Sequence, residues 1–254
     1  MYIRSLSLRH FRTYMRLELD LPAAPILLIG ANAQGKTSLL EAIAYLALGH
    51  SPLTPTDQHL LNWTAVQTGM PFAQVQAEVV KKRQTETLEI ALQRAQMNNG
   101  SARLGKRIRV NNHPVRRADL AGHLNTVIFL PEDVGLLGGP PTGRRHRLDD
   151  LLSQLYPEYV TALARYQSAL TRRNVLLRHL RERGGDRAQL EPLESILAQT
   201  GVLLAVYRQR AIIALSLHAD RFHQELTGGK AWLQLQYRAG FAAAQPQAVQ
   251  YRLA

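Results

Sequence analysis

The sequence predicts an α/β protein in which a sheet formed by the first 140 residues is followed by a helical lobe. Three observations support this fold class. Short runs of alternating apolar and polar residues occur up to about residue 130, as expected of half-buried strands. Near residue 30, a glycine-rich segment separates an apolar run from a helical one. Beyond residue 144, apolar residues recur at steps of three and four, which is typical of helices.

Strand patterns dominate the first part of the chain. Residues 17–21 alternate strictly between apolar and acidic side chains, which indicates a half-buried strand. The short apolar run 25–29 is rich in branched residues, as a buried parallel strand should be. Asn111 and Asn112 are a turn signal after the strand pattern at 107–110. The other predicted strands cover residues 2–8, 72–80, 87–92, 126–130 and 231–237.

Helical patterns occupy residues 38–48 and most of the segment from 144 to 226. Two long helices, to about residue 183 and from about 187, are joined by Gly184 and Gly185, with Asp186 as the predicted N-cap. We expect them to form an antiparallel hairpin whose apolar stripe packs within the chain; a coiled coil with a partner is the alternative. The predicted domains are the sheet region 1–140, the helical lobe 141–228 and the start of a return to the first domain, 229–254.

A glycine-rich loop follows the apolar run 25–29. Its sequence matches G-x-x-x-x-G-K-[ST], the phosphate-binding loop of nucleoside triphosphatases, placed between strand and helix as the motif requires. Small residues let several backbone N–H groups converge on one phosphate. We expect Lys36 to lie beside the outer phosphates and the Thr37 hydroxyl to bind Mg²⁺. The loop consists of Gly30, Ala31, Asn32, Ala33, Gln34, Gly35, Lys36 and Thr37.

One segment resembles the acidic strand end that holds the metal and polarises water in P-loop ATPases. It is an apolar run, 127–130, followed by Pro131, Glu132 and Asp133. Proline between the run and the acids misplaces them for metal ligation, so we interpret the acids as first-turn residues that cap a short helix. The histidines show no metal-ligand spacing. The sequence therefore offers no evident catalytic carboxylate.

Composition restricts the class of protein further. The 254 residues are 46% hydrophobic, which is enough for a folded core, and cysteine is absent, which excludes disulfides and thiolate metal sites. Neither a signal peptide nor a membrane span is recognisable, so we expect a cytoplasmic protein with no membrane partner. The net charge of +12 favours nucleic acid as a partner, with mere solubility as the alternative. Basic clusters lie at 81–83, 106–109, 116–117, 144–147 and 172–173.

Together these segments resemble the RecF family, bacterial recombination and gap-repair ATPases of the ABC/SMC-like class. Residues 1–14 resemble the opening strand and the N-F-R-x-Y element of that family, and residues 32–37 and 40–43 match its loop and helix. The resemblance extends to about residue 180. Further matches are Asp57, Leu60, Leu61, Trp63, Pro131, Glu132, Asp133, Leu136, Gly139, Pro141, Arg144, Arg145, Leu148, Asp149, 152–155, Pro157, Tyr159, Tyr166, Arg173, Asn174, Leu176 and Leu177.

The resemblance implies an ABC-type P-loop ATPase head with an N-terminal mixed sheet and an inserted helical lobe. It implies ATP and Mg²⁺ as cofactors, and an ATP-dependent homodimer with each nucleotide between two heads. It also implies binding to single-stranded, gapped and duplex DNA, weak DNA-stimulated ATPase activity in the complete protein, and cooperation with RecR and RecO to load RecA. In such heads the N-F-R element lies near the adenine, which suggests Phe11 and Arg12 as further nucleotide contacts.

The chain departs from the family pattern at several positions. His10 stands where Asn is usual, residues 51–54 replace a more basic stretch, and Gly138 and Arg147 replace a usual Lys and Phe. The signature motif, the acidic strand end and the switch histidine of the family would follow residue 254, so we expect part of the head to be missing. The alternatives are another SMC-like head, which needs a longer helical arm, and a truncated DNA-binding fragment that does not hydrolyse ATP.

Overall fold

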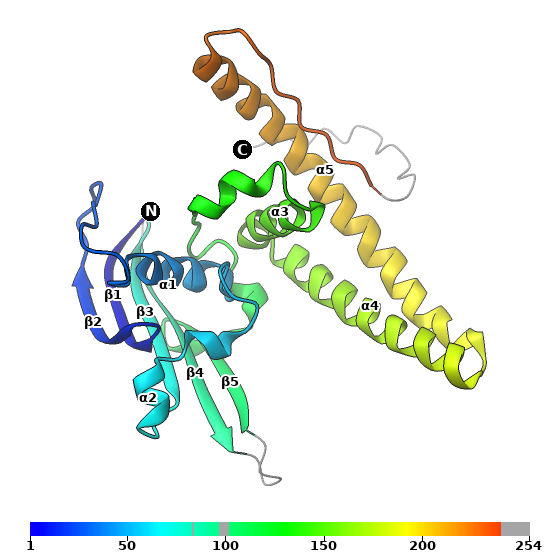
Figure 1. Ribbon diagram of the computed structural model, residues 1–254, viewed down its shortest axis with the longest axis horizontal. Helices are drawn as coiled ribbons and strands as arrows, with labels where there is room; N and C mark the ends of the chain where they lie inside the picture. Colours follow the sequence, from blue (N-terminus) through cyan, green and yellow to red (C-terminus); the bar gives the residue numbers. More distant parts are fainter. Residues whose placement is uncertain (83, 97–101, 240–254) are drawn as a thin grey trace. The chain divides into compact units, whose positions relative to one another are not determined.

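The computed structural model describes residues 1–82, 84–96 and 102–239, and the chain divides into two compact units (Figure 1). The first unit comprises residues 1–140 and 153–157. The second comprises residues 141–152 and the described residues from 158 onward. The first unit contains a sheet with short helices, and the second is helical.

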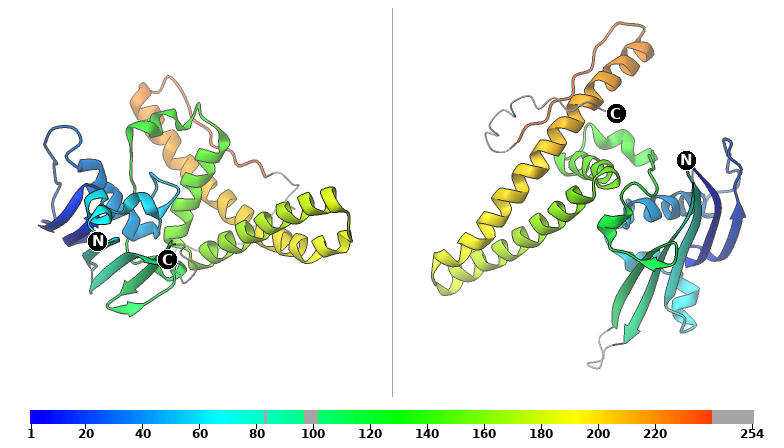
Figure 2. Two further views of the ribbon diagram at one scale, coloured as in Figure 1. Left: turned by 60° about the horizontal axis from the view of Figure 1, so that its bottom comes forward. Right: turned by 180° about the vertical axis from the view of Figure 1, so that it is seen from behind.

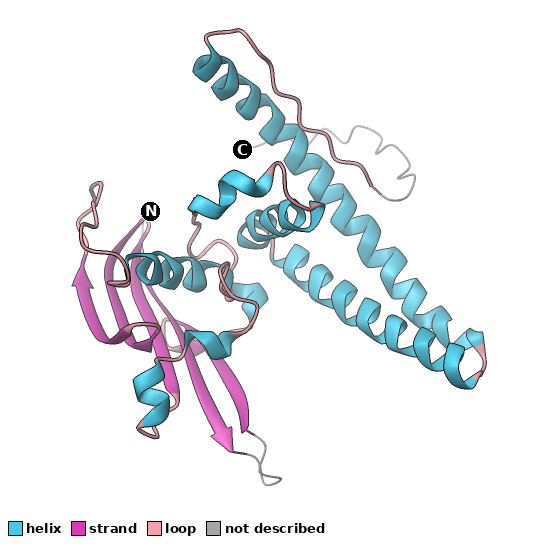
Figure 3. Cartoon of the chain, in the orientation of Figure 1, coloured by secondary structure: helices cyan, strands magenta, loops and turns pink. Residues whose placement is uncertain are grey.

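A six-stranded sheet forms the frame of the first unit (Figure 3). Its strand order is β2-β1-β3-β4-β5-β6, and each neighbouring pair is antiparallel. The α/β fold class is confirmed, although the sheet of the described residues is antiparallel rather than mixed. The strands are β1 (Tyr2–Phe11), β2 (Tyr14–Asp20), β3 (Phe72–Val80), β4 (Thr85–Gln96), β5 (Ala102–Val110) and β6 (His113–Pro114).

One face of this sheet is covered by helix α1 (Lys36–Leu48). Alternate residues of β3, from Ala73 to Val79, are buried, and the residues between them are half-buried. They pack with Tyr45 and Leu46 of α1 in one core cluster. The predicted alternation therefore has its expected physical cause, because side chains of a strand point to opposite faces of the sheet.

Short helices and turns complete the first unit. Asn111 and Asn112 connect β5 to β6 with φ angles of 49° and 67°, a left-handed conformation that asparagine tolerates better than most residues. The predicted turn is therefore confirmed. The other short elements are η1 (Asp57–Leu60), α2 (Trp63–Gln67), η2 (Arg117–Leu120) and η3 (Pro131–Leu136).

Three predicted strands, at 25–29, 126–130 and 231–237, are wrong for the described structure, because none of them joins a ladder. Leu27, Ile29 and Val127 are 81%, 85% and 95% exposed. An apolar run becomes a strand only when a neighbouring strand supplies a ladder of backbone hydrogen bonds, and no described strand forms such a ladder with these segments.

The second unit is built on a long helical hairpin (Figure 2). The rings of Tyr159 and Tyr207, on opposite arms, lie 5.8 Å apart. Asp186 accepts a hydrogen bond from the Ala188 N–H, as predicted for an N-cap. The prediction of an antiparallel hairpin with intrachain packing is confirmed. The helices are α3 (Pro141–Leu155), α4 (Pro157–Arg183), η4 (Arg187–Leu190) and α5 (Glu191–Thr227).

A buried polar network joins three helices of this unit. The Arg208 guanidinium lies 2.8 Å from the Asp149 carboxylate, which also accepts a hydrogen bond from the Tyr159 hydroxyl. Burial, together with the hydrogen bond to Asp149, raises the pKa of the Tyr159 hydroxyl. Because each buried charge has a partner, the network avoids the cost of an isolated charge in the core.

Among the described helices, the segment Arg187–Thr227 is long and apolar enough to cross a membrane by length and composition alone. Part of its apolar face is explained by packing, because Leu204 and Ala205 are buried within the second unit. Arg208, on the same helix, is paired inside the network described above. These contacts account for part of the apolar surface of the helix, since 17% of its most apolar stretch is buried.

Candidate nucleotide-binding site

The glycine-rich loop 30–37 runs into the first turn of α1, and its Gly35 packs against the β1–β2 turn. Gly35 is buried with a φ of 93°, and the Tyr14 hydroxyl donates a 3.2 Å hydrogen bond to its carbonyl oxygen. A Cβ atom at Gly35 would come within 2.6 Å of the Thr13 Oγ1 atom and 2.9 Å of the Tyr14 ring. Glycine is therefore required here for its conformation and for its size.

The N-terminus of α1 is open to an anion. Its N-cap is Gly35, which supplies no side-chain hydrogen bond, and its first turn contains no acidic residue. The first N–H groups of an α-helix have no partner within the helix, and the helix dipole adds positive potential at the same end. The loop and the helix end thus form the arrangement that binds phosphate groups in nucleotide-binding proteins.

Lys36 folds back onto its own loop. Its Nζ atom donates hydrogen bonds of 2.7 Å to the Gly30 carbonyl oxygen and 2.6 Å to the Ala31 carbonyl oxygen. Thr37 is exposed and lines the adjacent pocket. Within this short segment, the Lys36 ammonium group is held by the loop carbonyls, whereas the Thr37 side chain is open to the pocket. The remaining loop residues, Asn32, Ala33 and Gln34, are exposed, and Ala33 has a φ of 63°.

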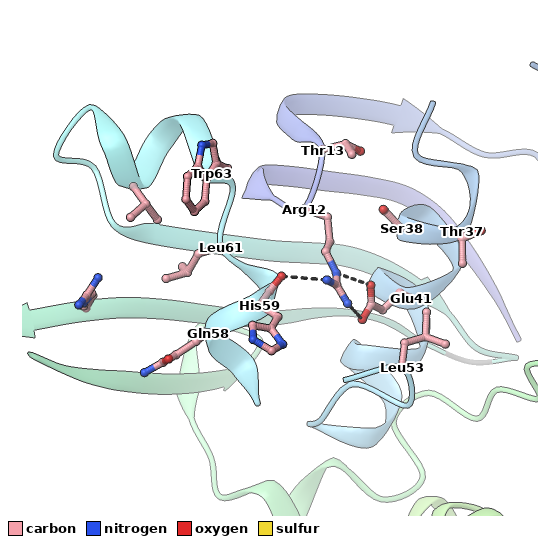
Figure 4. A pocket seen from close by; sticks show the side chains of 12 residues that line it. Arg12, Thr13, Thr37, Ser38, Glu41, Leu53, Gln58, His59, Leu61 and Trp63 are labelled. Carbon is pink, nitrogen blue, oxygen red and sulfur yellow. Dashed lines mark hydrogen bonds and ion pairs between the residues drawn. The ribbon is translucent and has the colours of Figure 1, made fainter. Parts of the chain in front are cut away.

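A pocket of about 780 Å³ lies beside the loop (Figure 4). This volume falls in the range of sites that hold cofactors and other small ligands, about 300–1,000 Å³. Figure 4 shows Thr37 and Ser38 toward one end, Trp63 toward the other, and Arg12 with Glu41 between them. The lining residues are Arg12, Thr13, Thr37, Ser38, Glu41, Leu53, Gln58, His59, Leu61, Trp63, Val66 and Arg94.

An ion pair forms the middle of this pocket. Arg12 donates through Nε and Nη2 to the two carboxylate oxygens of Glu41, each at 2.7 Å, and through Nη1 to the His59 carbonyl oxygen at 2.9 Å. Glu41 is 1% exposed and also accepts a hydrogen bond from the Ser51 hydroxyl. Sequence reasoning missed Glu41. The available signal was a carboxylate within an apolar helical pattern, which requires a buried partner.

Phe11 and Arg12 are adjacent in sequence but have different surroundings. Phe11 is fully buried and packs in the core with Tyr45, at a ring separation of 6.2 Å. Its side chain therefore does not line the pocket, whereas that of Arg12 does. Phe11 is the last residue of β1, whereas Arg12 lies in the turn to β2 with a φ of 53°, so its side chain does not follow the strand.

Asp133 has the capping role expected from the sequence. Its carboxylate accepts a 2.9 Å hydrogen bond from the Leu130 N–H at the start of η3, whose first residue is Pro131. The interpretation of this segment as a cap is confirmed. Within the described ranges, no group of three or more His, Cys, Asp or Glu side chains is arranged to hold a metal ion.

The basic clusters lie in both units, and several of their members are paired. Lys106 contacts the Asp57 carboxylate at 2.6 Å, Arg116 contacts Asp119, and Arg173 contacts Glu194. Arg83 of the first cluster lies outside the described residues. Some of the clustered positive charge is therefore paired within the fold, whereas residues such as Arg107 and Arg172 are exposed to solvent.

A phosphate-binding loop at the start of a helix, beside a pocket of nucleotide size, defines this chain as a P-loop nucleotide-binding protein. Within that class, the chain belongs to the family described as an AAA domain, whose model matches residues 5–132.

Two relatives with similar sequences are both named RecF. The chain is 44% identical over 248 residues to the DNA replication and repair protein RecF of Chloroflexus aurantiacus, with 94% of this chain and 63% of the relative covered. It is 40% identical to RecF of Herpetosiphon aurantiacus, with 93% and 64% covered. The chain thus spans somewhat less than two thirds of the length of these relatives.

Solved structures agree with this comparison. Two structures of the recombination mediator protein RecF in the RecFOR pathway match with TM-scores of 0.78 and 0.77 at 28% identity. Each match covers 89% of this chain and 58% of the other, and one of the two is described as RecF-ATP. The resemblance to RecF and the ABC-type ATPase head are therefore confirmed.

Proposed function

We propose that residues 30–37 bind the phosphates of ATP together with Mg²⁺. Backbone N–H groups of the loop and of the first turn of α1 surround the phosphates. Lys36 exchanges its contacts with the loop carbonyls for contacts with the β- and γ-phosphates, and the Thr37 hydroxyl binds the metal ion. Arg12 contacts the nucleotide from the pocket wall, and the buried Phe11 ring anchors the end of β1, next to Arg12, in the core.

The observation that supports this proposal is the environment of Gly35 and of the helix end that follows it. Gly35 has a conformation and a packing environment that exclude a side chain, and the helix end behind it has no capping group. The related protein described as RecF-ATP supports adenosine triphosphate as the ligand.

The test is titration of the purified chain with ATP in the presence and absence of Mg²⁺, measured by calorimetry. The variant Lys36→Ala should lose most of its affinity, because it removes the charge that faces the outer phosphates. Lys82→Ala, which removes an exposed lysine of the same unit, is the matched control and should bind as the wild type does. Equal affinities of the wild type and Lys36→Ala would contradict the proposal.

We further infer that the chain is the ATP-binding part of a cytoplasmic DNA repair protein of the RecF type. In the longer protein, ATP binding promotes a homodimer on single-stranded, gapped or duplex DNA, and the dimer acts with RecO and RecR to load RecA. Slow, DNA-stimulated ATP hydrolysis releases the dimer. The support is the identity with RecF proteins over nearly the whole chain and the net charge of +12.

DNA binding and dimerisation need separate tests. DNA affinity should fall steeply as salt rises from 50 to about 200 mM, because contacts with phosphates release counterions. The change Lys36→Ala in the longer protein should abolish ATP-dependent dimerisation, measured by sedimentation, and leave basal DNA contact largely intact. DNA affinity independent of salt, or dimerisation unaffected by the change, would count against this inference.

A second candidate function is a DNA-binding fragment that binds ATP without hydrolysing it. It is favoured by the described residues, in which the acidic segment after residue 130 serves as a cap and no acidic cluster suits a metal ion. Comparison of ATP turnover by this chain and by a longer version of the protein decides between the two functions.

A further inference from the structure

Trp63 presents an exposed indole to the pocket that adjoins the phosphate-binding loop. Its side chain is 74% exposed, although a tryptophan of a folded protein gains most from burial. Figure 4 shows it at the end of the pocket remote from Thr37. An exposed aromatic ring inside a pocket of this size is a surface on which a planar ligand group can stack.

The position of Trp63 is fixed by its neighbour. Asn62 is 5% exposed, and its side chain accepts a hydrogen bond from the Ala65 N–H and donates one to the Arg12 carbonyl oxygen at 2.7 Å. The Asn62 N–H donates to the His10 carbonyl oxygen at 2.8 Å. Trp63 is therefore the first residue of a short helix that is tied to the end of β1, and its backbone is fixed relative to Arg12.

We propose that Trp63 is the platform on which the nucleobase stacks when the phosphates occupy residues 30–37. The proposal rests on the proposed function, because it concerns the other end of the same ligand. A nucleotide is elongated, with its charge at one end and an aromatic base at the other. The pocket has the matching order: Thr37 and Ser38, then the Arg12–Glu41 pair, then Trp63.

The charges around the pocket agree with this orientation. Glu41 is the one acidic residue among the lining residues, and Arg12 neutralises it. The lining also includes a second cation, Arg94. Apolar Leu61 lies toward the Trp63 end in Figure 4, and apolar Val66 belongs to the same short helix as Trp63. An uncharged aromatic base fits this end, since stacking on an aromatic side chain requires only a π-face and an apolar surrounding.

The first experiment compares Trp63→Ala with Trp232→Ala. Trp232 is the other tryptophan of the chain, has the same 74% exposure and lies in the second unit. Trp63→Ala should bind ATP about tenfold more weakly or worse, the typical effect of removing one base–aromatic stack. Inorganic tripolyphosphate, which has no base, should bind both variants and the wild type equally. Trp63→Phe should recover most of the ATP affinity because it retains a ring.

The second experiment uses Trp63 as its own reporter. In a Trp232→Phe background, Trp63 is the sole indole, and ATP should quench its fluorescence while tripolyphosphate should not. Equal ATP affinity of wild type and Trp63→Ala, or equal quenching by ATP and tripolyphosphate, would overturn the stacking proposal. Failure of the wild type to bind either ligand would instead contradict the phosphate site itself, so the two proposals fail separately.

Discussion

The guanidinium of Arg12 and the carboxylate of Glu41 form a two-point ion pair, with Nε and Nη2 each 2.7 Å from a carboxylate oxygen. The pair connects the end of β1 to the middle of α1, the helix that begins at the phosphate-binding loop. It therefore joins the wall of the pocket to the element that presents Lys36 and Thr37.

Removal of Arg12 should destabilise the first unit strongly. Arg12→Met leaves the Glu41 carboxylate buried without its counter-charge, which costs about 3–5 kcal/mol in comparable cases. Urea denaturation measures the loss. Arg16→Met is the matched control, because its pair with Glu18 is exposed and should contribute less than about 1 kcal/mol. Equal stabilities of the two variants would show that the buried pair has no special importance.

Substitution of Gly35 should damage both stability and nucleotide binding. Gly35→Ala places a Cβ atom 2.6 Å from Thr13 and forces alanine into a left-handed conformation, at a cost of about 1–3 kcal/mol. Gly69→Ala is the control, because Gly69 has a φ of 78° but open space around it. Thermal denaturation and ATP titration should show the larger effect at Gly35. A similar effect at both positions would mean that packing against the β1–β2 turn is unimportant.

Glu86 should make stability depend on pH in the acid range. Burial opposes its ionisation, but hydrogen bonds from Lys81 and His123 outweigh burial and hold the pKa of this carboxyl below its ordinary value of 4.5. A lowered pKa in the folded state means that the stabilisation is complete above about pH 4.5 and is lost as the pH falls through the folded value.

Urea denaturation at pH 7 and near pH 3.5 measures this effect. Glu86→Gln should lower stability at pH 7 and reduce the loss on acidification. Glu18→Gln changes the same functional group on the exposed strand β2 and controls for general acid effects. An unchanged pH profile in Glu86→Gln would assign the acid sensitivity to other groups.

The buried network of the helical unit should respond differently at each member. Tyr159→Phe removes one hydrogen bond to a charged group and should cost about 1.5–3 kcal/mol. Asp149→Asn leaves the Arg208 charge without its partner and should cost about 3–5 kcal/mol. Circular dichroism in urea follows the helical transition. The exposed change Glu182→Gln should have little effect, and equal costs for all three would argue against the network.

Features with a local cause were predictable from the sequence. The alternation of β3 matched its burial residue by residue, and the Asn111–Asn112 turn and the Asp186 N-cap followed from the side chains present. The helix predicted after the glycine-rich segment is confirmed as α1 for the same reason, whereas phosphate binding by residues 30–37 stays a prediction.

Features that depend on distant partners were not predictable. The run 25–29 has strand character, but a ladder requires a second chain segment, and its residues remain exposed. The Glu41 pair depends on residues 29 positions apart, and the importance of Trp63 depends on Asn62 and the end of β1. A sequence pattern shows which side of a helix or strand is apolar. It does not show which distant segment packs against that side.

The exposed apolar segments also affect the solubility of the purified chain. Leu27, Ile29 and Val127 are exposed on segments that belong to no strand or helix. Exposed apolar surfaces associate with one another, so concentrated solutions should become turbid whereas dilute ones stay clear. Light scattering across a dilution series would reveal the onset. Biochemical assays on this chain should therefore use low micromolar concentrations. At higher concentrations, aggregation would be mistaken for specific oligomerisation.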